Sequence, residues 1–157
     1  MPDPFVGSAR YIISDYLDEL RKAVDGLPDE AVNWAPAGDD TNSIAVLVTH
    51  NLNSTRLWMS VGLGAAPPDR DRDVEFEAKA ENAAELLGMI NELGAEILAL
   101  MDGAGDIDWT ENRRAHLGSD PGLPNYVPAA FGIMHAVEHF SQHVGHVTLT
   151  RQLWDAR

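Results

Sequence analysis

Four long segments of this chain repeat apolar residues every three or four positions, which is the spacing of one face of an α-helix. They cover about residues 6–24, 43–63, 80–101 and 128–154. Glycines or prolines follow the first three segments, and Pro128 opens the fourth, where its missing N–H would have no partner anyway. Strand-like alternation is scarce, so the sequence predicts an all-α fold, a four-helix bundle.

Two connections between these segments are long. Residues 64–79 hold two prolines and the run DRDRD at 69–73, which we expect to be a solvated loop. Val74 and Phe76 then alternate with acidic residues, so a short strand could follow. Residues 104–127 contain several glycines and prolines. Loops of this length are uncommon in compact domains and are often functional, so both are expected to line a site.

Charge and composition exclude several classes of protein. The 157 residues include 11 Lys and Arg, 25 Asp and Glu and no cysteine, which gives a formal net charge of −14. Such a chain repels nucleic-acid phosphates and anionic membranes, and without cysteine it has no disulfide, thiolate metal site or cysteine nucleophile. No apolar run approaches the ~20 residues of a membrane span, and the N-terminus does not resemble a signal peptide. We expect a cytoplasmic protein with a single domain over residues 1–157 and no nucleic-acid or membrane partner.

Histidine is distributed unevenly along the chain. His50 lies on the apolar stripe of the second segment. His116 lies in the last long loop, where we expect it to be exposed. The fourth segment carries the other four histidines: His135, His139, His143 and His146. A helical residue advances about 100°, so the last four all point along one ridge of their helix.

Helical spacing limits which of these histidines can bind one metal ion. Residues three or four apart have Cβ atoms about 5–6 Å apart, which allows the pairs His135/His139, His139/His143 and His143/His146. His135 and His143 are about 12 Å apart along the axis and cannot share a metal. His50 is the candidate third ligand, because a polar ring on an apolar stripe needs a partner and bundles build metal sites from facing helices. Spacing alone leaves all three pairs open, and His135 and His146 can also be read as ordinary surface residues.

Three stretches make the chain resemble the DinB/YfiT-like superfamily. They are LPDEAVNWAP at 27–36, NSIAVLVTH at 42–50 and EHFSQHVGHVTLTRQL at 138–153. The resemblance implies an up-down-down-up four-helix bundle, usually a homodimer, with a divalent metal held by three histidines. We expect this metal to be Zn or Ni. Matched position by position, the ligands are His50, His139 and His143. His146 stands where many relatives have Gln, so it could be a fourth ligand or a proton carrier.

The resemblance also implies an activity. Members with assigned activities include transferases and isomerases that use low-molecular-weight thiols such as bacillithiol or mycothiol, and we expect a small-molecule substrate. A metal lowers the pKa of a bound thiol or water, so the protein itself needs no cysteine. Two alternatives are a hydrolase using metal-bound water, with His146 or Glu138 as base, and a non-catalytic dimeric bundle that binds a metal or ligand.

Three further residues lie where a role at the site can be considered from their position on the helices. Trp58 could line the mouth of a pocket, although an aromatic residue on a helical stripe is more often part of the core. Arg151 lies off the histidine ridge by about 120°, which favours a capping or interface role. Glu138 is about 100° around the helix from His139 and is expected to point away from the site.

Overall fold

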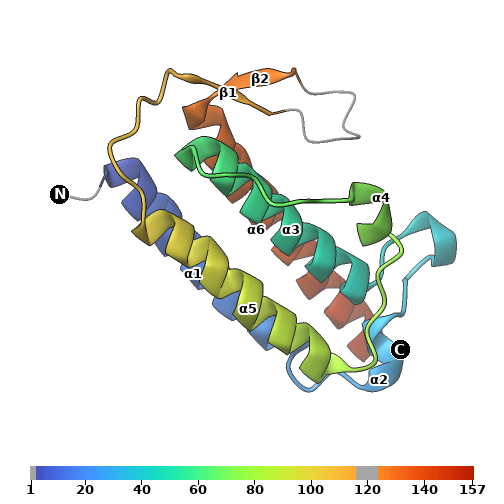
Figure 1. Ribbon diagram of the computed structural model, residues 1–157. Helices are drawn as coiled ribbons and strands as arrows, with labels where there is room; N and C mark the ends of the chain where they lie inside the picture. The colour runs from blue at the N-terminus through green and yellow to red at the C-terminus, as the bar shows by residue number, and fades with distance from the viewer. Residues whose placement is uncertain (1–2, 116–123) are drawn as a thin grey trace.

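The computed structural model of the protein describes residues 3–115 and 124–157, and four long helices dominate it (Figure 1). These are α1 (Pro4–Val24), α3 (Ile44–Leu63), α5 (Ala83–Asp102) and α6 (Ala129–Asp155). Each lies within about three residues of the predicted segment. The expected all-α bundle is therefore confirmed. No helix in the described part of the chain is both long enough and apolar enough to cross a membrane.

Side-chain caps fix where three of these helices begin. The Asp3 carboxylate accepts hydrogen bonds from the backbone N–H groups at the start of α1, and the Ser43 hydroxyl and the Asn82 amide oxygen do the same for α3 and α5. These bonds satisfy backbone donors that have no partner within the helix. At the other end of α3, Gly64 adopts φ 72°, a left-handed conformation that glycine tolerates best. Helix α3 therefore ends at a glycine that the sequence analysis places directly after this segment.

Contacts between the long helices establish their relative directions. Arg10 pairs with Asp102 and Arg21 with Asn91, so α1 and α5 are antiparallel. Thr49 contacts Met89, and seven residues farther along both helices Arg56 pairs with Glu96, so α3 and α5 run the same way. The guanidinium of Arg151, near the C-terminal end of α6, donates to the carbonyl oxygens of Ala23 and Asp25 and so caps the C-terminal end of α1. The C-terminal ends of α1 and α6 therefore lie together, and these two helices are parallel. In chain order the long helices thus run up, down, down and up.

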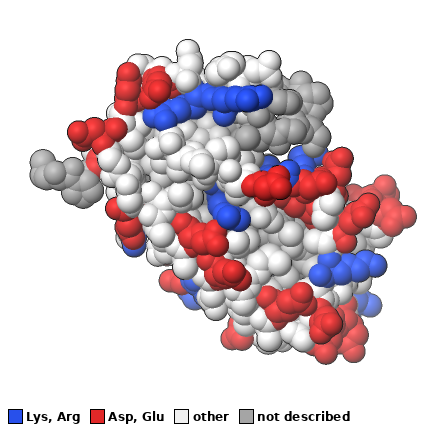
Figure 2. Space-filling model, in the orientation of Figure 1, with Lys and Arg blue, Asp and Glu red and all other residues white. Residues whose placement is uncertain are grey.

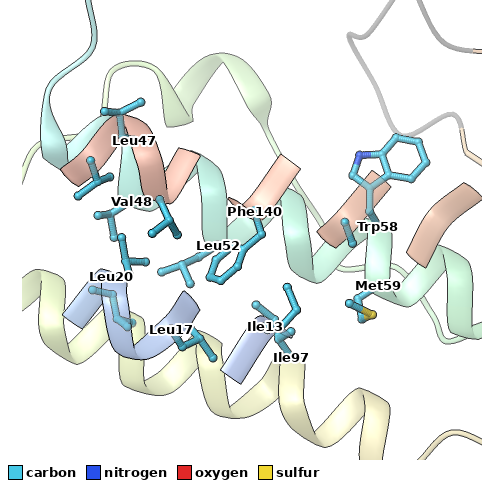
Figure 3. Close-up of a cluster of buried hydrophobic side chains, with 14 of the residues drawn as sticks. Ile13, Leu17, Leu20, Leu47, Val48, Leu52, Trp58, Met59, Ile97 and Phe140 are labelled. Atoms are coloured by element: carbon cyan, nitrogen blue, oxygen red, sulfur yellow. The ribbon is translucent and has the colours of Figure 1, made fainter. Parts of the chain in front are cut away.

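The core lies where all four long helices meet. Leu17, Leu52, Ile97 and Phe140 are completely buried there, one from each helix, and Figure 3 shows several of these side chains directed toward one another. Gly94, inside α5, makes room for this core, since a Cβ there would lie 2.9 Å from Leu17 Cδ2. The glycine that weakens α5 as an isolated helix thereby allows α1 to approach it.

Helices α3 and α6 are in close backbone contact at a pair of glycines. A Cβ on Gly132 would lie 2.6 Å from the backbone nitrogen of Gly62, and a Cβ on Gly62 would lie 2.7 Å from the backbone nitrogen of Ile133. Real Cβ atoms do not come that close to backbone, so neither position has room for a side chain. The two glycines set the separation of the helices that carry the histidines.

The long connections contain short elements of their own. The link from α1 to α3 holds α2 (Asp29–Val32) and a 3₁₀ turn, η1 (Gly38–Asp40). The link from α3 to α5 holds α4 (Arg72–Glu75), so the strand suggested by Val74 and Phe76 was a wrong prediction. The link from α5 to α6 contains β1 (Asn112–Arg114) and β2 (Tyr126–Pro128), an antiparallel pair that the sequence analysis did not predict. His116 lies outside the described residues.

Acidic side chains are spread over the surface. Figure 2 shows Asp and Glu scattered across the visible face, with fewer Lys and Arg among them. No single acidic patch dominates this face. The negative charge of the chain therefore does not by itself mark a binding site.

Candidate metal centre

Three histidines from the two facing helices α3 and α6 come together. His50 lies in the N-terminal half of α3 and is buried, whereas His139 and His143 lie one turn apart on α6 and are partly buried. One ring nitrogen from each lies within 4.8 Å of those of the other two. Of the three pairs allowed by helical spacing, the structure therefore brings the middle pair to His50.

The nitrogens are also spaced like the ligands of a single ion. His50 Nε2 lies 3.2 Å from His139 Nε2. Two nitrogens bound to one tetrahedral zinc at about 2.0–2.1 Å would be about 3.3 Å apart. His139 Nδ1, the other nitrogen of that ring, is buried with no hydrogen-bond partner among the described residues. The donor set and its spacing thus fit a divalent metal.

Burial and mutual repulsion keep two of the histidines neutral. Burial, followed by the neighbouring positive charge that His143, His50 and other groups would add, lowers the pKa of His139 to about 2. Burial, followed by His50 and His146, lowers the pKa of His143 to about 4. Neutral imidazole is the form that binds metals. These rings therefore keep a lone pair for a metal well below neutral pH.

A buried ion pair contacts the outer edge of His50. His50 Nδ1 lies 2.9 Å from Glu75 Oε2, and Arg70 donates to both oxygens of that carboxylate at 2.7 Å. The side chains of Glu75 and Arg70 are only 5% and 10% exposed. Burial alone would raise the pKa of Glu75, but the hydrogen bonds from Arg70 and His50 outweigh it and lower that pKa, so the carboxylate is ionised at neutral pH.

Sequence reasoning missed both members of this pair. The run at 69–73 was expected to be solvated, and Asp69, Asp71 and Asp73 are exposed, but Arg70 turns inward. Around α4 the usual pattern is inverted, because Val74 is 61% exposed while Glu75 is buried. In the sequence, the only sign of this pair is an arginine and a glutamate five residues apart, after a helix with an inward histidine. This sign is weak, because it does not say that the two side chains turn inward.

The other histidines of the ridge flank the three. His135 packs edge-on against Trp58 and is stacked with Phe131. Trp58 is itself buried, as expected of a core residue. His146 is exposed, and its Nδ1 lies 3.3 Å from His143 Nδ1.

Two charged residues of α6 lie outside the cluster. Glu138 is exposed and lies 3.5 Å from His135, not from the three clustered rings, so it points away as expected. This removes it as the base for the hydrolytic alternative. Arg151 has the capping role described above.

Comparison with known proteins places this fold. The family model described as the DinB superfamily matches residues 14–153. Among solved structures, a conserved protein from Enterococcus faecalis has a TM-score of 0.72 and 13% identity, covering 96% of this chain and 97% of that chain. A mutant of a mycothiol-dependent maleylpyruvate isomerase has a TM-score of 0.61 and 11% identity, covering 89% of this chain but only 59% of that chain.

At such low identity the two solved structures bear on the fold alone, and no curated protein matches the sequence. The family model, in contrast, spans both histidine-bearing helices and nearly the whole chain. By this match, the chain belongs to the DinB superfamily.

Proposed function

We propose that this protein is a divalent-metal enzyme that activates a low-molecular-weight thiol for transfer or isomerisation, with His50, His139 and His143 as the metal ligands. The observation that carries the proposal is the convergence of nitrogens from three partly or fully buried histidines within 4.8 Å. A metal bound there would lower the pKa of a coordinated thiol or water and so supply a nucleophile at neutral pH. Zn and Ni suit an all-imidazole ligand set.

The thiol part of the proposal draws on a structural neighbour and on composition. One solved structure of the same fold is that of a mycothiol-dependent isomerase. The present chain contains no cysteine, so a sulfur nucleophile would have to come from a cosubstrate. The neighbour favours thiol chemistry over hydrolysis, and the composition is compatible with it.

The chain's own residues would bind and orient a small substrate. A hollow of about 330 Å³ lies beside His146 and is lined by Leu47, Leu149 and Leu153 among others. Because His146 contacts His143, this hollow adjoins the histidine cluster. It would hold the body of a small molecule against apolar side chains.

The homodimer implied by the resemblance also belongs to this proposal, and sedimentation equilibrium tests it.

Metal content is the first test. Protein purified without a histidine tag should contain about one equivalent of divalent metal by elemental analysis, and His50→Ala and His139→Ala should each lose it, because two ligands hold a metal far more weakly than three. Asn53→Ala is the matched control on α3, since within the described part of the chain the Asn53 side chain bonds only the carbonyl of Thr49. Parent protein that retains no metal after incubation with Zn and Ni and desalting would overturn the proposed site.

Thiol-dependent turnover is the second test. The metal-loaded protein should consume a chromogenic electrophile only when a thiol such as mycothiol or bacillithiol is added, and His50→Ala should abolish that rate. A metal-loaded protein with no thiol-dependent rate across several thiols and electrophiles would contradict the thiol proposal while leaving the metal site intact.

A further inference from the structure

Glu75 lies where it can act on the histidine cluster without joining it. Its carboxylate contacts Nδ1 of His50, on one edge of the ring, whereas the opposite nitrogen, Nε2, faces His139. Glu75 is also not among the groups whose ligand atoms converge on one point. Its position is therefore that of a partner of His50, rather than that of a metal ligand.

The contact distances indicate where the proton of His50 is located. An ionised carboxylate can only accept hydrogen bonds. If His50 Nδ1 had no proton, its lone pair would face Glu75 Oε2 at 2.9 Å, and two acceptors would repel each other. Arg70 Nη2 donates one N–H to Glu75 Oε2 at 2.7 Å and lies 3.4 Å from the same nitrogen, so any bond from its second N–H to Nδ1 is much longer than the 2.9 Å contact between Nδ1 and the carboxylate. Nδ1 therefore carries a proton, and Nε2 is the ring nitrogen left to bind a metal.

The segment around α4 holds Glu75 in this position. Asp71 caps α4 by accepting from the backbone N–H groups of Asp73 and Val74, which closes the single turn that directs Glu75 inward. Arg70 balances the buried charge, which would otherwise be costly. The ring of Phe76 lies against the ring of His50, with centroids 4.8 Å apart. The imidazole is thus held by a hydrogen bond at one edge and a ring contact on one face.

We infer that Glu75, held by Arg70, is a positioning residue that fixes His50 in the Nδ1–H tautomer and so directs the Nε2 lone pair toward His139 and His143. A carboxylate behind a ligating histidine fixes the orientation of the ring and raises its basicity, and loss of such a partner costs about 10–100-fold in metal affinity. The metal part of this inference rests on the proposed function. The tautomer part does not.

The tautomer can be read without a metal. In metal-free protein labelled with ¹⁵N-histidine, a long-range ¹H–¹⁵N correlation distinguishes the protonated from the unprotonated ring nitrogen. Wild-type His50 should show a protonated Nδ1 and an unprotonated Nε2. Glu75→Gln, which keeps the shape but can donate as well as accept, and Glu75→Ala should both give a mixture of tautomers. Glu77→Gln is the matched control, being exposed and two residues away, and should match the wild type.

Zinc affinity, measured by competition with a chromogenic chelator, is the second readout. Glu75→Gln and Glu75→Ala should bind Zn²⁺ about 10–100-fold more weakly than the parent, and Glu77→Gln within about twofold of it. A protonated Nε2 in wild-type His50, or an unchanged tautomer and unchanged affinity in both Glu75 variants, would overturn the inference. If the parent binds no Zn²⁺ but its tautomer depends on Glu75, the positioning role stands and the proposed metal function fails.

Discussion

The two sides of the histidine cluster are held by different kinds of structure. On the α3 side, His50 is oriented by a hydrogen bond to a buried carboxylate that a loop supplies. On the α6 side, His139 and His143 are related only by helical spacing, and His139 Nδ1 has no hydrogen-bond partner among the described residues. The first side therefore depends on one local bond. The second depends on how far α6 lies from α3.

That separation is set by small residues some distance from the histidines. Gly62 and Gly132 meet without room for a Cβ, two turns or less from His139 on α6. Helices whose backbones touch at one point have little freedom to move apart farther along. The comparison therefore predicts that the α6 side is most sensitive to packing changes, and the α3 side to the loss of a hydrogen bond.

The largest expected effect comes from filling the glycine contact. Gly132→Ala should lower the free energy of unfolding by about 3 kcal/mol, the upper end for overpacking, because the new methyl would meet backbone rather than a flexible side chain. Forcing α6 away from α3 should also weaken Zn²⁺ binding by tenfold or more. Urea denaturation and chelator competition measure the two effects.

Gly145→Ala is the matched control, because Gly145 lies on the same helix and a Cβ there would meet nothing within 4 Å. It should leave the protein unchanged or more stable by about 0.5–1 kcal/mol, since alanine favours the helix. Equal stability of the two variants would mean that the glycine contact does not set the helix separation, and the comparison between the two sides would fail.

A second, smaller effect concerns pH and the α6 side. Above about pH 6.5 His139 is unprotonated in both the folded and the unfolded protein, so it contributes no pH dependence to the free energy of unfolding. Below it only the unfolded state binds the proton, because burial and the neighbouring rings lower the pKa of folded His139 to about 2. Stability of the metal-free protein should therefore fall on acidification, by up to about 1.4 kcal/mol per pH unit for this histidine.

Urea denaturation of chelator-treated protein between pH 7.5 and 4.5 measures this dependence. His143, with its pKa lowered to about 4, adds to the same slope until the folded state is also protonated. A His139→Gln variant removes one of the two groups. Its free energy of unfolding should therefore fall less steeply on acidification, by up to about 1.4 kcal/mol per pH unit, which corresponds to one proton. Identical slopes in the variant and the parent would show that folded His139 titrates like an ordinary histidine.

The same contrast explains what could be predicted from the sequence. The four long helices follow from apolar periodicity, and helical spacing limits the ligands on α6 to three histidine pairs, both being local properties of a helix. The choice of His139 and His143 among those pairs came from the resemblance to the DinB/YfiT-like superfamily. Arg70 and Glu75 could not be found this way. Their burial depends on how residues 64–82 return across α3, and a charge-rich segment without periodicity gives no sign of which residues turn inward. The packing of Gly62 against Gly132 was missed for the same reason, since it joins positions 70 residues apart.

The smallest expected effect tests whether exposure decides the value of a supporting hydrogen bond. His146 Nδ1 lies 3.3 Å from His143 Nδ1, a placement comparable to that of Glu75 beside His50, but His146 is exposed. Water can replace a solvent-exposed hydrogen bond at little cost, whereas a buried one has no substitute. His146→Ala should therefore change Zn²⁺ affinity by less than about threefold, against 10–100-fold for Glu75→Ala. Chelator competition compares the two variants directly. A loss of tenfold or more in His146→Ala would instead make His146 a fourth ligand, and the α6 side of the cluster would then carry three of the four.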